Sequence, residues 1–331
     1  MDISLVTGGA GFIGSHVAKA LVNNGEQVLV LDDLSGGYED NVPAKAKFIK
    51  GSINDRTLIE NIFKSENVQH IFHLAAYAAE GLSHFIKHYN YQNNLIGSVN
   101  LINEAIKHKV KCFVFTSSIA VYGKGQLPMK EDTLPVPEDP YGIAKLAVEQ
   151  ELRVSHEMFG LDYIIFRPHN VYGEHQNIGD RYRNVLGIFI NQLMQNKPLT
   201  IFGDGSQTRA FSYIDDVAPY IAAAVDNPKA YNQVFNIGAD QDYSVKELAE
   251  KIMKEMGIAQ EIRYLQERNE VKHAFSDHSK AKDVFGIDNF TSLEEGIRKM
   301  VAWAKEHGAR KTPKFTDIEI PEKLPAVWLE E

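Results

Sequence analysis

Three residues of the sequence could together move a proton: Ser118, Tyr141 and Lys145. Ser118 follows an apolar run, and Tyr141 and Lys145 come some twenty residues later, four positions apart on a predicted helix. Because positions i and i+4 share a helix face, the Lys145 ammonium should stabilise the Tyr141 phenolate and lower the tyrosine pKa from about 10 toward neutrality. Ser118 would hold the substrate oxygen whose proton Tyr141 removes. Taken alone, the Tyr-x-x-x-Lys spacing would more often be a structural accident than a catalytic pair.

A glycine-rich turn contains Gly8, Gly11 and Gly14 between an apolar strand and a segment with helical spacing. Such glycines let the backbone approach a pyrophosphate, which the free N–H groups at the helix N-terminus bind. Asp32 ends the next strand, where its carboxylate would accept both adenosine ribose hydroxyls and repel a 2′-phosphate. We therefore expect a dinucleotide site that prefers NAD to NADP. Asp33 could instead cap the following loop.

Composition excludes several classes of function. The net charge of −9 and the lack of a Lys/Arg block argue against a nucleic-acid partner. Cys112 is the only cysteine, so no disulfide can form within the chain, and a reducing compartment, the cytoplasm, is expected. The sequence shows neither a signal-peptide pattern nor an apolar run long enough to span a membrane. Its 12 histidines lack metal-ligand spacing, so we expect no metal.

Strand and helix patterns alternate through the first half of the chain, which predicts a parallel sheet in an α/β fold. The predicted strands are 3–7, 28–31, 47–50, 70–74, 112–117 and 163–167. The predicted helices follow the glycine turn and then cover 56–64, 89–108 and 141–159. Several strands are apolar at successive positions, as expected for strands that are buried on both faces.

The second half of the chain is less regular. Helical patterns near 184–195, 215–226, 244–256 and 292–306 alternate with segments rich in Gly, Asn, Asp and Gln. We expect an NAD-binding domain over 1–172, to which the chain returns near 211–240, and a smaller substrate-binding lobe over 173–310. Three prolines in 311–331 indicate a C-terminal extension.

An ordered set of motifs then supports a family resemblance. The motifs are Thr7-Gly-Gly-Ala-Gly-Phe-Ile-Gly-Ser15, Asp32-Asp-Leu34, His73-Leu-Ala-Ala76, Asn93-Asn94, Thr116-Ser-Ser118, Tyr122-Gly123, Tyr141-x-x-x-Lys145, Arg167-Pro-His-Asn-Val-Tyr-Gly173 and Gly203-Asp-Gly-Ser-Gln-Thr-Arg209. Together they resemble the extended short-chain dehydrogenase/reductase family, in its nucleotide-sugar epimerase and dehydratase branch. Each motif is weak singly, but the ordered set is specific and covers nearly the whole chain.

The resemblance implies a Rossmann-type, doubly wound parallel sheet with a smaller C-terminal substrate lobe, and a bound NAD. The residues that it implies in cofactor binding are Gly8, Gly11, Phe12, Ile13, Gly14, Asp32, Asp33, Leu34, Ser52, Ile53, Leu74, Ala75, Ala76, Asn93, Thr116, Tyr141, Lys145 and Pro168. Family members commonly form homodimers through two long helices of each subunit, here the predicted helices 89–108 and 141–159.

The family chemistry starts from a nucleoside-diphosphate sugar whose C4 hydroxyl faces Tyr141 and Ser118. Tyr141 takes the hydroxyl proton, the hydride of C4 passes to NAD, and Lys145 holds the ribose. The 4-keto sugar can take the hydride back on its other face, lose water or lose carbon dioxide. The last two fates need further acid and base groups, but Ile119 and Ala120 occupy the corresponding positions. The resemblance therefore favours a 4-epimerase of the UDP-glucose/UDP-galactose type.

Other substrates and reactions remain alternatives. They are UDP-glucuronate or a UDP-N-acetylhexosamine as the substrate, a nucleotide-sugar dehydratase or reductase, and a nucleotide-binding regulator without activity. The resemblance implies that Asn170, Arg209 and Arg268 bind the substrate together with Ser118 and Tyr141, although the motif around Arg268 is one residue short. Arg181 and Arg183 either meet a sugar carboxylate or form a solvated surface.

Three further positions depart from the family pattern. Ser52 stands where an aspartate usually contacts adenine, so Asn54 could supply that contact. His169 either packs in the interior or touches the sugar. Ala274 stands where a bulky residue would narrow the pocket, which keeps a 2-acetamido sugar open.

Overall fold

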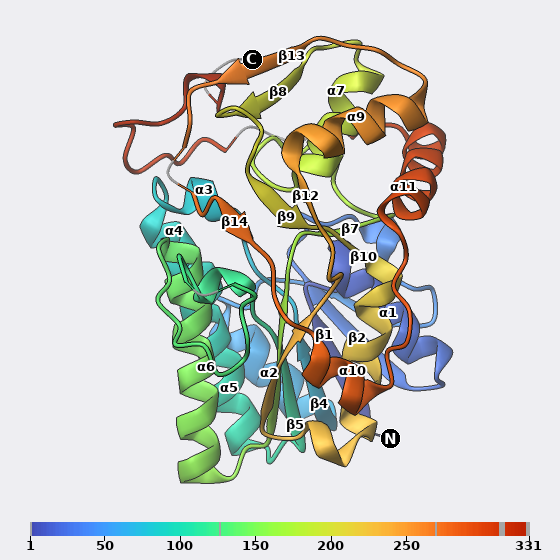
Figure 1. The fold of residues 1–331 in the computed structure, drawn as a ribbon. Helices are drawn as coiled ribbons and strands as arrows, with labels where there is room; N and C mark the ends of the chain where they lie inside the picture. Colours follow the sequence, from blue (N-terminus) through green and yellow to red (C-terminus); the bar gives the residue numbers. More distant parts are fainter. Residues whose placement is uncertain (1, 126, 269, 311–314, 329–331) are drawn as a thin grey trace.

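The computed structural model describes residues 2–125, 127–268, 270–310 and 315–328. Its larger part is a seven-stranded sheet in the order β3-β2-β1-β4-β5-β6-β11, with every neighbouring pair parallel and helices on both faces (Figure 1). The strands are β1 (Ile3–Thr7), β2 (Gln27–Asp32), β3 (Lys47–Lys50), β4 (Val68–His73), β5 (Cys112–Thr116), β6 (Tyr163–Pro168) and β11 (Gln233–Ile237). The order reverses between β1 and β4, where ligands of doubly wound sheets bind. The predicted α/β, Rossmann-type fold is confirmed.

The sheet is buried on both faces because successive strand residues point into two separate cores. Val6 and Val30 belong to the core that includes α1 (Phe12–Asn23). Leu5 and Leu29 belong to the core on the other face. That second core is covered by α2 (Arg56–Ser65), α5 (Gly97–Lys107) and α6 (Pro140–Phe159). The continuous apolar runs of the sequence follow from this arrangement.

The predicted long helix over 89–108 is wrong in one respect, because it is interrupted. It consists of α4 (Lys87–Tyr91), a π-helical turn (Gln92–Ile96) and α5. In the turn, the Asn93 amide donates to the Tyr89 carbonyl and the Asn94 amide to the Tyr77 carbonyl. Such π-helical turns are frequent at functional sites, and Asn93 reaches the candidate cofactor pocket.

The second lobe lies above the sheet in the view of Figure 1 and contains α7 (Val185–Met194), α9 (Val245–Met256) and α11 (Leu293–His307). Its short strands were not predicted, because two to four residues are too few to show a period and their partners are distant in sequence. They are β7 (Val171–Tyr172), β8 (Leu199–Phe202), β9 (Thr208–Ala210), β10 (Ser212–Tyr213), β12 (Asp242–Ser244), β13 (Ile262–Leu265) and β14 (His273–Ala274). The predicted helix over 215–226 is a 3₁₀ turn (Ile214–Asp216), a short α8 (Ala218–Ala223) and a second 3₁₀ turn (Ala224–Asp226).

The described part of the C-terminal extension, 315–328, packs against α3 (Glu80–Ser83). Trp328 is buried in a cluster with Leu82 and Ile86. Residues 311–314 and 329–331 of the predicted extension lie outside the described residues. A short helix, α10 (Ser279–Phe285), follows β14. None of the helices within the described ranges is both long and apolar enough to cross a membrane.

Candidate active site

The glycine turn after β1 has no room for side chains. Gly8 has a φ of +70°, and a Cβ there would lie 2.6 Å from the backbone nitrogen of Ala75. A Cβ on Gly14 would lie 2.1 Å from the Gly8 carbonyl oxygen. Gly11 precedes the first turn of α1, whose free N–H groups therefore open toward this cradle. The backbone can thus come close to a pyrophosphate, as the family cofactor requires.

Asp32 ends β2 beside this turn and is buried. Its two carboxylate oxygens accept hydrogen bonds from the backbone N–H groups of Ala10 (3.0 Å) and Leu34 (2.8 Å). Burial raises the pKa of Asp32, and these two bonds oppose the shift. Asp33 accepts from the N–H of Ser35 at 2.9 Å, which is the loop-capping alternative for that residue.

One pocket is lined by half of the residues that the resemblance implies in cofactor binding. Those that line it are Gly8, Gly11, Asp32, Asp33, Ile53, Leu74, Ala75, Ala76 and Asn93. The other half do not line it: Phe12, Ile13, Gly14, Leu34, Ser52, Thr116, Tyr141, Lys145 and Pro168. Near the implied adenine end, Ser52 accepts from the Asn54 N–H (3.2 Å), and Asn54 donates to Asn93 (3.1 Å). Asn54 itself is not among the residues that line the pocket.

Other lining residues were not predicted, and Arg183 is the most informative of them. Its guanidinium pairs with Asp180 at 2.5 Å and lies over the Tyr77 ring at 5.0 Å. A Cβ on Gly36 would lie 3.3 Å from the same guanidinium. The sequence indicates Arg183 only as a possible partner of a sugar carboxylate or as part of a solvated surface, and its place beside Tyr77 depends on a contact between segments far apart in the sequence.

Ser118 and Tyr141 come together because a tight turn after β5 packs against the start of α6. Ser118 caps the 3₁₀ turn Ile119–Val121 by accepting from the Ala120 N–H at 3.1 Å. A Cβ on Gly142 would lie 2.6 Å from the Ala120 carbonyl oxygen, so glycine is what permits this close approach. Asp139 caps α6 by accepting from the Gly142 N–H at 2.8 Å. The Ser118 hydroxyl lowers the pKa of Tyr141, so the two side chains face one another.

The protonation of this pair differs from the expectation. Burial raises the pKa of Tyr141 above 10, the Ser118 hydroxyl opposes this rise, and Asp139 and Glu80 add to it. Burial also lowers the pKa of Lys145 to about 7, against the charge of Glu149. The prediction that Lys145 brings the Tyr141 pKa toward neutrality is therefore wrong for this structure. The Lys145 ammonium donates to the Thr116 carbonyl at 2.8 Å and lies 5.7 Å from the Tyr141 ring centre.

Two of the implied substrate residues, Arg209 and Arg268, share one carboxylate. Glu270 lies 3.6 Å from Arg209 and 3.4 Å from Arg268. Arg209 also donates to the backbone carbonyls of Thr208, Val271 and Lys272, so most of its donors are engaged. Arg268 stacks on Phe202 at 3.9 Å, and its buried Nε makes no hydrogen bond with the described residues. Arg268, whose motif is one residue short of the family pattern, thus has more donors available for a substrate than Arg209 has.

Asn170 and His169 follow β6. Asn170 has a φ of +39° and donates to the Ala210 carbonyl at 3.3 Å. His169 is buried, its two ring nitrogens contacting the Ala210 carbonyl (2.9 Å) and His278 (2.9 Å). Of the two alternatives for His169, the structure supports packing in the interior.

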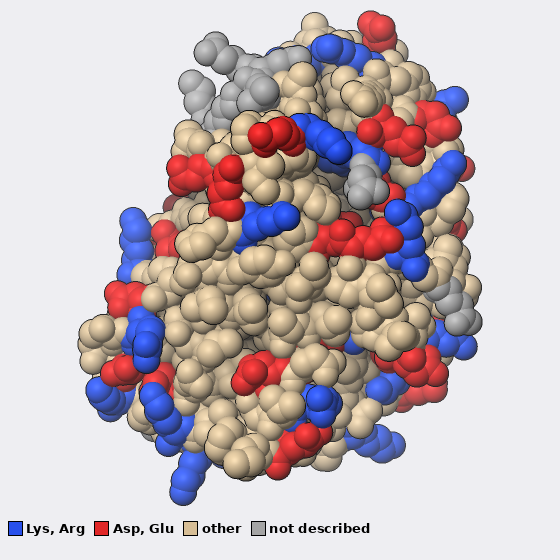
Figure 2. Space-filling view, turned by 90° about the vertical axis from the view of Figure 1, so that its left-hand side faces the viewer, with Lys and Arg blue, Asp and Glu red and all other residues tan. Residues whose placement is uncertain are grey.

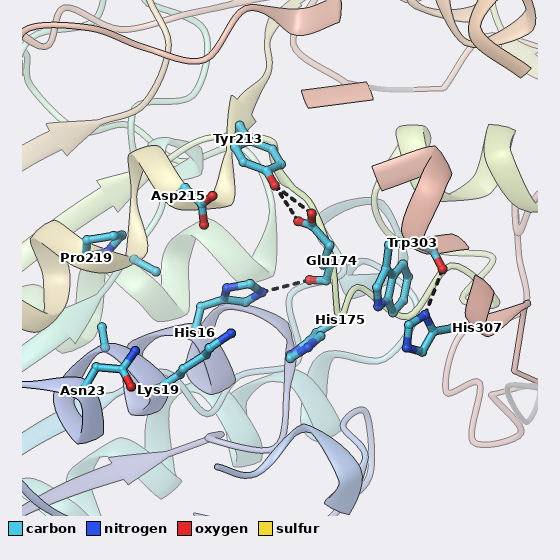
Figure 3. Close-up of a pocket in the computed structure, with 12 residues that line it drawn as sticks. His16, Lys19, Asn23, Glu174, His175, Tyr213, Asp215, Pro219, Trp303 and His307 are labelled. Carbon is cyan, nitrogen blue, oxygen red and sulfur yellow. Dashed lines mark hydrogen bonds between the residues drawn. The ribbon is translucent and has the colours of Figure 1, made fainter. Parts of the chain in front are cut away.

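A second, larger cavity of about 470 Å³ is lined by none of the glycines of the cradle (Figure 3). It is lined from α1 by His16 and Lys19, from α11 by Trp303 and His307, and by the loop after β7, in which the Glu174 carboxylate accepts from Tyr213. None of the implied catalytic, cofactor or substrate residues lines this cavity. In the described ranges, no three His, Cys, Asp or Glu side chains are grouped so that they could hold a metal ion.

The NAD dependent epimerase/dehydratase family model matches residues 4–238. The chain is 37% identical over 306 residues to a putative UDP-glucose 4-epimerase of Methanocaldococcus jannaschii, a match that covers 92% of this chain and 98% of the relative. The UDP-glucose 4-epimerase of Thermotoga maritima, solved with UDP-glucose, is 36% identical with a TM-score of 0.88, over 92% of this chain and 99% of the other. The UDP-glucuronic acid 4-epimerase of Bacillus cereus, solved with UDP-glucuronic acid and NAD, is 30% identical with a TM-score of 0.84, over 92% and 99%. The chain therefore belongs to the NAD-dependent epimerase/dehydratase family of the extended short-chain dehydrogenases/reductases.

Proposed function

We propose that this protein inverts C4 of a UDP-sugar of the glucose/galactose type. The observation that carries the proposal is the apolar turn between Ser118 and Tyr122. Ile119 and Val121 are buried there in a cluster with Met129, and Ala120 has no group that could transfer a proton. A reaction that removes water or carbon dioxide needs such a group close to the reacting carbon. With none on this turn, the chemistry stops at exchange at C4.

In this proposal the residues of the chain have separate tasks. The cradle of Gly8, Gly11 and Gly14 with Asp32 binds NAD, which supplies the acceptor and then the donor of the C4 hydride. Tyr141 removes the proton of the C4 hydroxyl and returns it to the product, and Ser118 holds the same oxygen by a hydrogen bond. The division into an NAD-binding domain over 1–172, with a return near 211–240, and a substrate lobe over 173–310 is part of the same proposal.

The UDP-glucose type is preferred to UDP-glucuronate because of Arg183. A sugar carboxylate would need a free cation, but Arg183 is paired with Asp180 and lies over Tyr77 at the edge of the candidate cofactor pocket. Asn170, Arg209 and Arg268 would bind the diphosphate and the sugar.

A second candidate function, elimination from the 4-keto sugar, is favoured by Glu80. This residue reaches solvent, yet the protein around its carboxyl raises the pKa to about 7, by desolvation and by the charge of Asp139, against Arg209 and Arg268. Glu80 also acts on the Tyr141 pKa, so its charge is within electrostatic range of the candidate catalytic pair. A carboxyl group that titrates near neutrality is suited to act as an acid or base.

Proton NMR of the purified protein with single sugars would decide between these functions. UDP-glucose, UDP-N-acetylglucosamine, UDP-glucuronate and a GDP-sugar are incubated separately, first without added cofactor and then with NAD. Appearance of UDP-galactose from UDP-glucose alone supports the proposal and shows that NAD is retained. A 4-keto-6-deoxy product would contradict the proposal and support elimination. A C4 epimer formed from one of the other nucleotide sugars would show that the proposed substrate is wrong.

We also propose a homodimer formed through α5 and α6, which lie side by side at the left of Figure 1. Large apolar side chains are exposed on these helices and at their ends: Ile96, Ile143, Val154, Met158 and Phe159. Figure 2 shows this side of the molecule, where a broad central area carries few charged side chains. Light scattering should give twice the chain mass of 37.2 kDa. Met158→Glu should shift the mass toward the monomer, and a monomeric unmodified protein would refute the proposal.

A further inference from the structure

A buried carboxylate that no sequence motif singled out lies one helical turn beyond Lys145. Glu149 is on the same face of α6 and only 4% exposed. Three hydrogen bonds hold its carboxylate: Ser117 donates to Oε1 at 2.5 Å, and Arg167 donates through Nε to Oε1 at 3.0 Å and through Nη2 to Oε2 at 2.5 Å. Because both oxygens are held, the negative charge has a fixed position.

Arg167 is fixed in turn. Its Nη1 donates to the Tyr122 hydroxyl at 2.7 Å, and that hydroxyl donates to Asn236 at 2.8 Å. The network thus ties together the end of β5, helix α6 and the end of β6 beneath the candidate site. These are the elements that carry Ser118, the Tyr141 and Lys145 pair, and Asn170.

Glu149 is the carboxylate that acts on Lys145. Apart from burial, its charge is the influence on the pKa of Lys145. Of the other groups around the lysine, His73 on β4 is buried, with a pKa lowered to about 3 by burial, and so is neutral. β5 contributes the Phe115 ring, 4.7 Å from Nζ, and the Thr116 carbonyl.

The remaining charged and titratable groups lie toward Tyr141 or on the far side of Glu149. Glu80 on α3, Asp139 at the start of α6 and Arg183 act on Tyr141, the first two raising its pKa and Arg183 lowering it. Asn90 of α4, which donates to the Pro140 carbonyl, is neutral. Arg167 is paired with Glu149.

We propose that Glu149, held by Arg167 and Ser117, is a positioning residue whose fixed negative charge favours the ammonium form of Lys145 beside Tyr141. The expected effect on kcat rests on the proposed function, whereas the expected effect on the titration of Lys145 does not. The Tyr141 and Lys145 pair loses its first proton as a unit, and two forms have the same proton count. One is phenolate with ammonium, which can accept the proton of the sugar hydroxyl. The other is phenol with neutral amine, which cannot, and Glu149 favours the first form.

The test is Glu149→Gln, which keeps the size of the side chain and removes its charge. A charge at the i+4 position in a protein interior of moderate dielectric shifts a pKa by about one to two units. We therefore expect the titration midpoint of Lys145 to move down by that amount. It would be followed by NMR of lysine labelled at Cε, with Lys145→Met for assignment and with NAD present. At the pH of maximum activity of the unmodified protein, kcat should fall by about ten- to a hundredfold.

Further variants separate charge from structure. Glu104→Gln removes another buried carboxylate, one that pairs with Lys107 on α5, and should change neither the Lys145 midpoint nor kcat. Glu149→Asp keeps the charge and should restore most of the midpoint. If Glu149→Gln does not fold, the double variant Glu149→Met with Arg167→Met replaces the ion pair by apolar groups, a change that proteins often tolerate. It should also show a lowered midpoint, but by less than Glu149→Gln, because the positive charge of Arg167 is removed as well.

The outcomes distinguish the inference from the proposed function. An unchanged Lys145 midpoint in Glu149→Gln, or in the double variant, refutes the inference whatever the activity. A lowered midpoint in a protein that acts on none of the sugars supports the inference and contradicts the proposed function. A fall in kcat without a lower midpoint shows that Glu149 is merely structural.

Discussion

Replacing Tyr141 by phenylalanine removes one oxygen from a residue that is only 7% exposed. The ring keeps its volume, so no cavity forms, and the interaction with the Ser118 hydroxyl is lost, which is worth at most about 1 kcal/mol. KM should therefore rise by no more than about fivefold. The proton acceptor is lost altogether, so kcat should fall by about 10²- to 10⁴-fold.

The raised pKa of Tyr141 makes this prediction sharper. A phenol with a pKa of 10 or more is ionised in at most about one molecule in a hundred at pH 8. Activity of the unmodified enzyme should therefore rise with pH where the tyrosine is mainly protonated. Tyr141→Phe should show no such rise.

The assay measures epimer formation by NMR or by a coupled dehydrogenase, and NAD content by absorbance after denaturation. Tyr91→Phe is the matched control. Tyr91 lies on α4, and its hydroxyl forms no observed hydrogen bond with another described residue. That variant should keep its activity. If Tyr141→Phe retains NAD and turns over within tenfold of the unmodified protein, the proton-transfer mechanism is wrong.

Three other predictions concern cofactor binding and stability. Asp32→Asn replaces the oxygen that accepts from Ala10, so NAD affinity, measured by titration calorimetry, should fall about tenfold. Gly14→Ala should abolish NAD retention and lower the melting temperature, since its Cβ would lie 2.1 Å from a carbonyl oxygen, whereas Gly125→Ala, with its nearest atom at 3.8 Å, should do neither. The pKa of His73 is lowered to about 3 in the folded state, so the unfolded state binds the proton first as pH falls from 6.5. The free energy of unfolding in urea should then decrease by about 1.4 kcal/mol per pH unit, with a shallower slope in His73→Gln.

Local spacing determined a large part of this protein. The glycine turn, the acidic residue after β2 and the apolar strands are short-range patterns, because each depends on neighbours within one strand, turn or helix. They predicted the sheet, the tight glycine turn beside it and the helix that carries Tyr141 and Lys145.

Other features depended on contacts between distant segments. Arg183 reaches the pocket beside Tyr77, and Arg167 meets Glu149 beneath the lysine, although each pair lies far apart in the sequence. The short strands of the second lobe likewise form only by pairing with remote partners. The direction of the Tyr141 pKa was decided by burial, which the sequence does not state. Helix spacing places Lys145 near Tyr141. The tertiary structure determines how far the two side chains are removed from water and which group the ammonium contacts, and these set the pKa of the phenol.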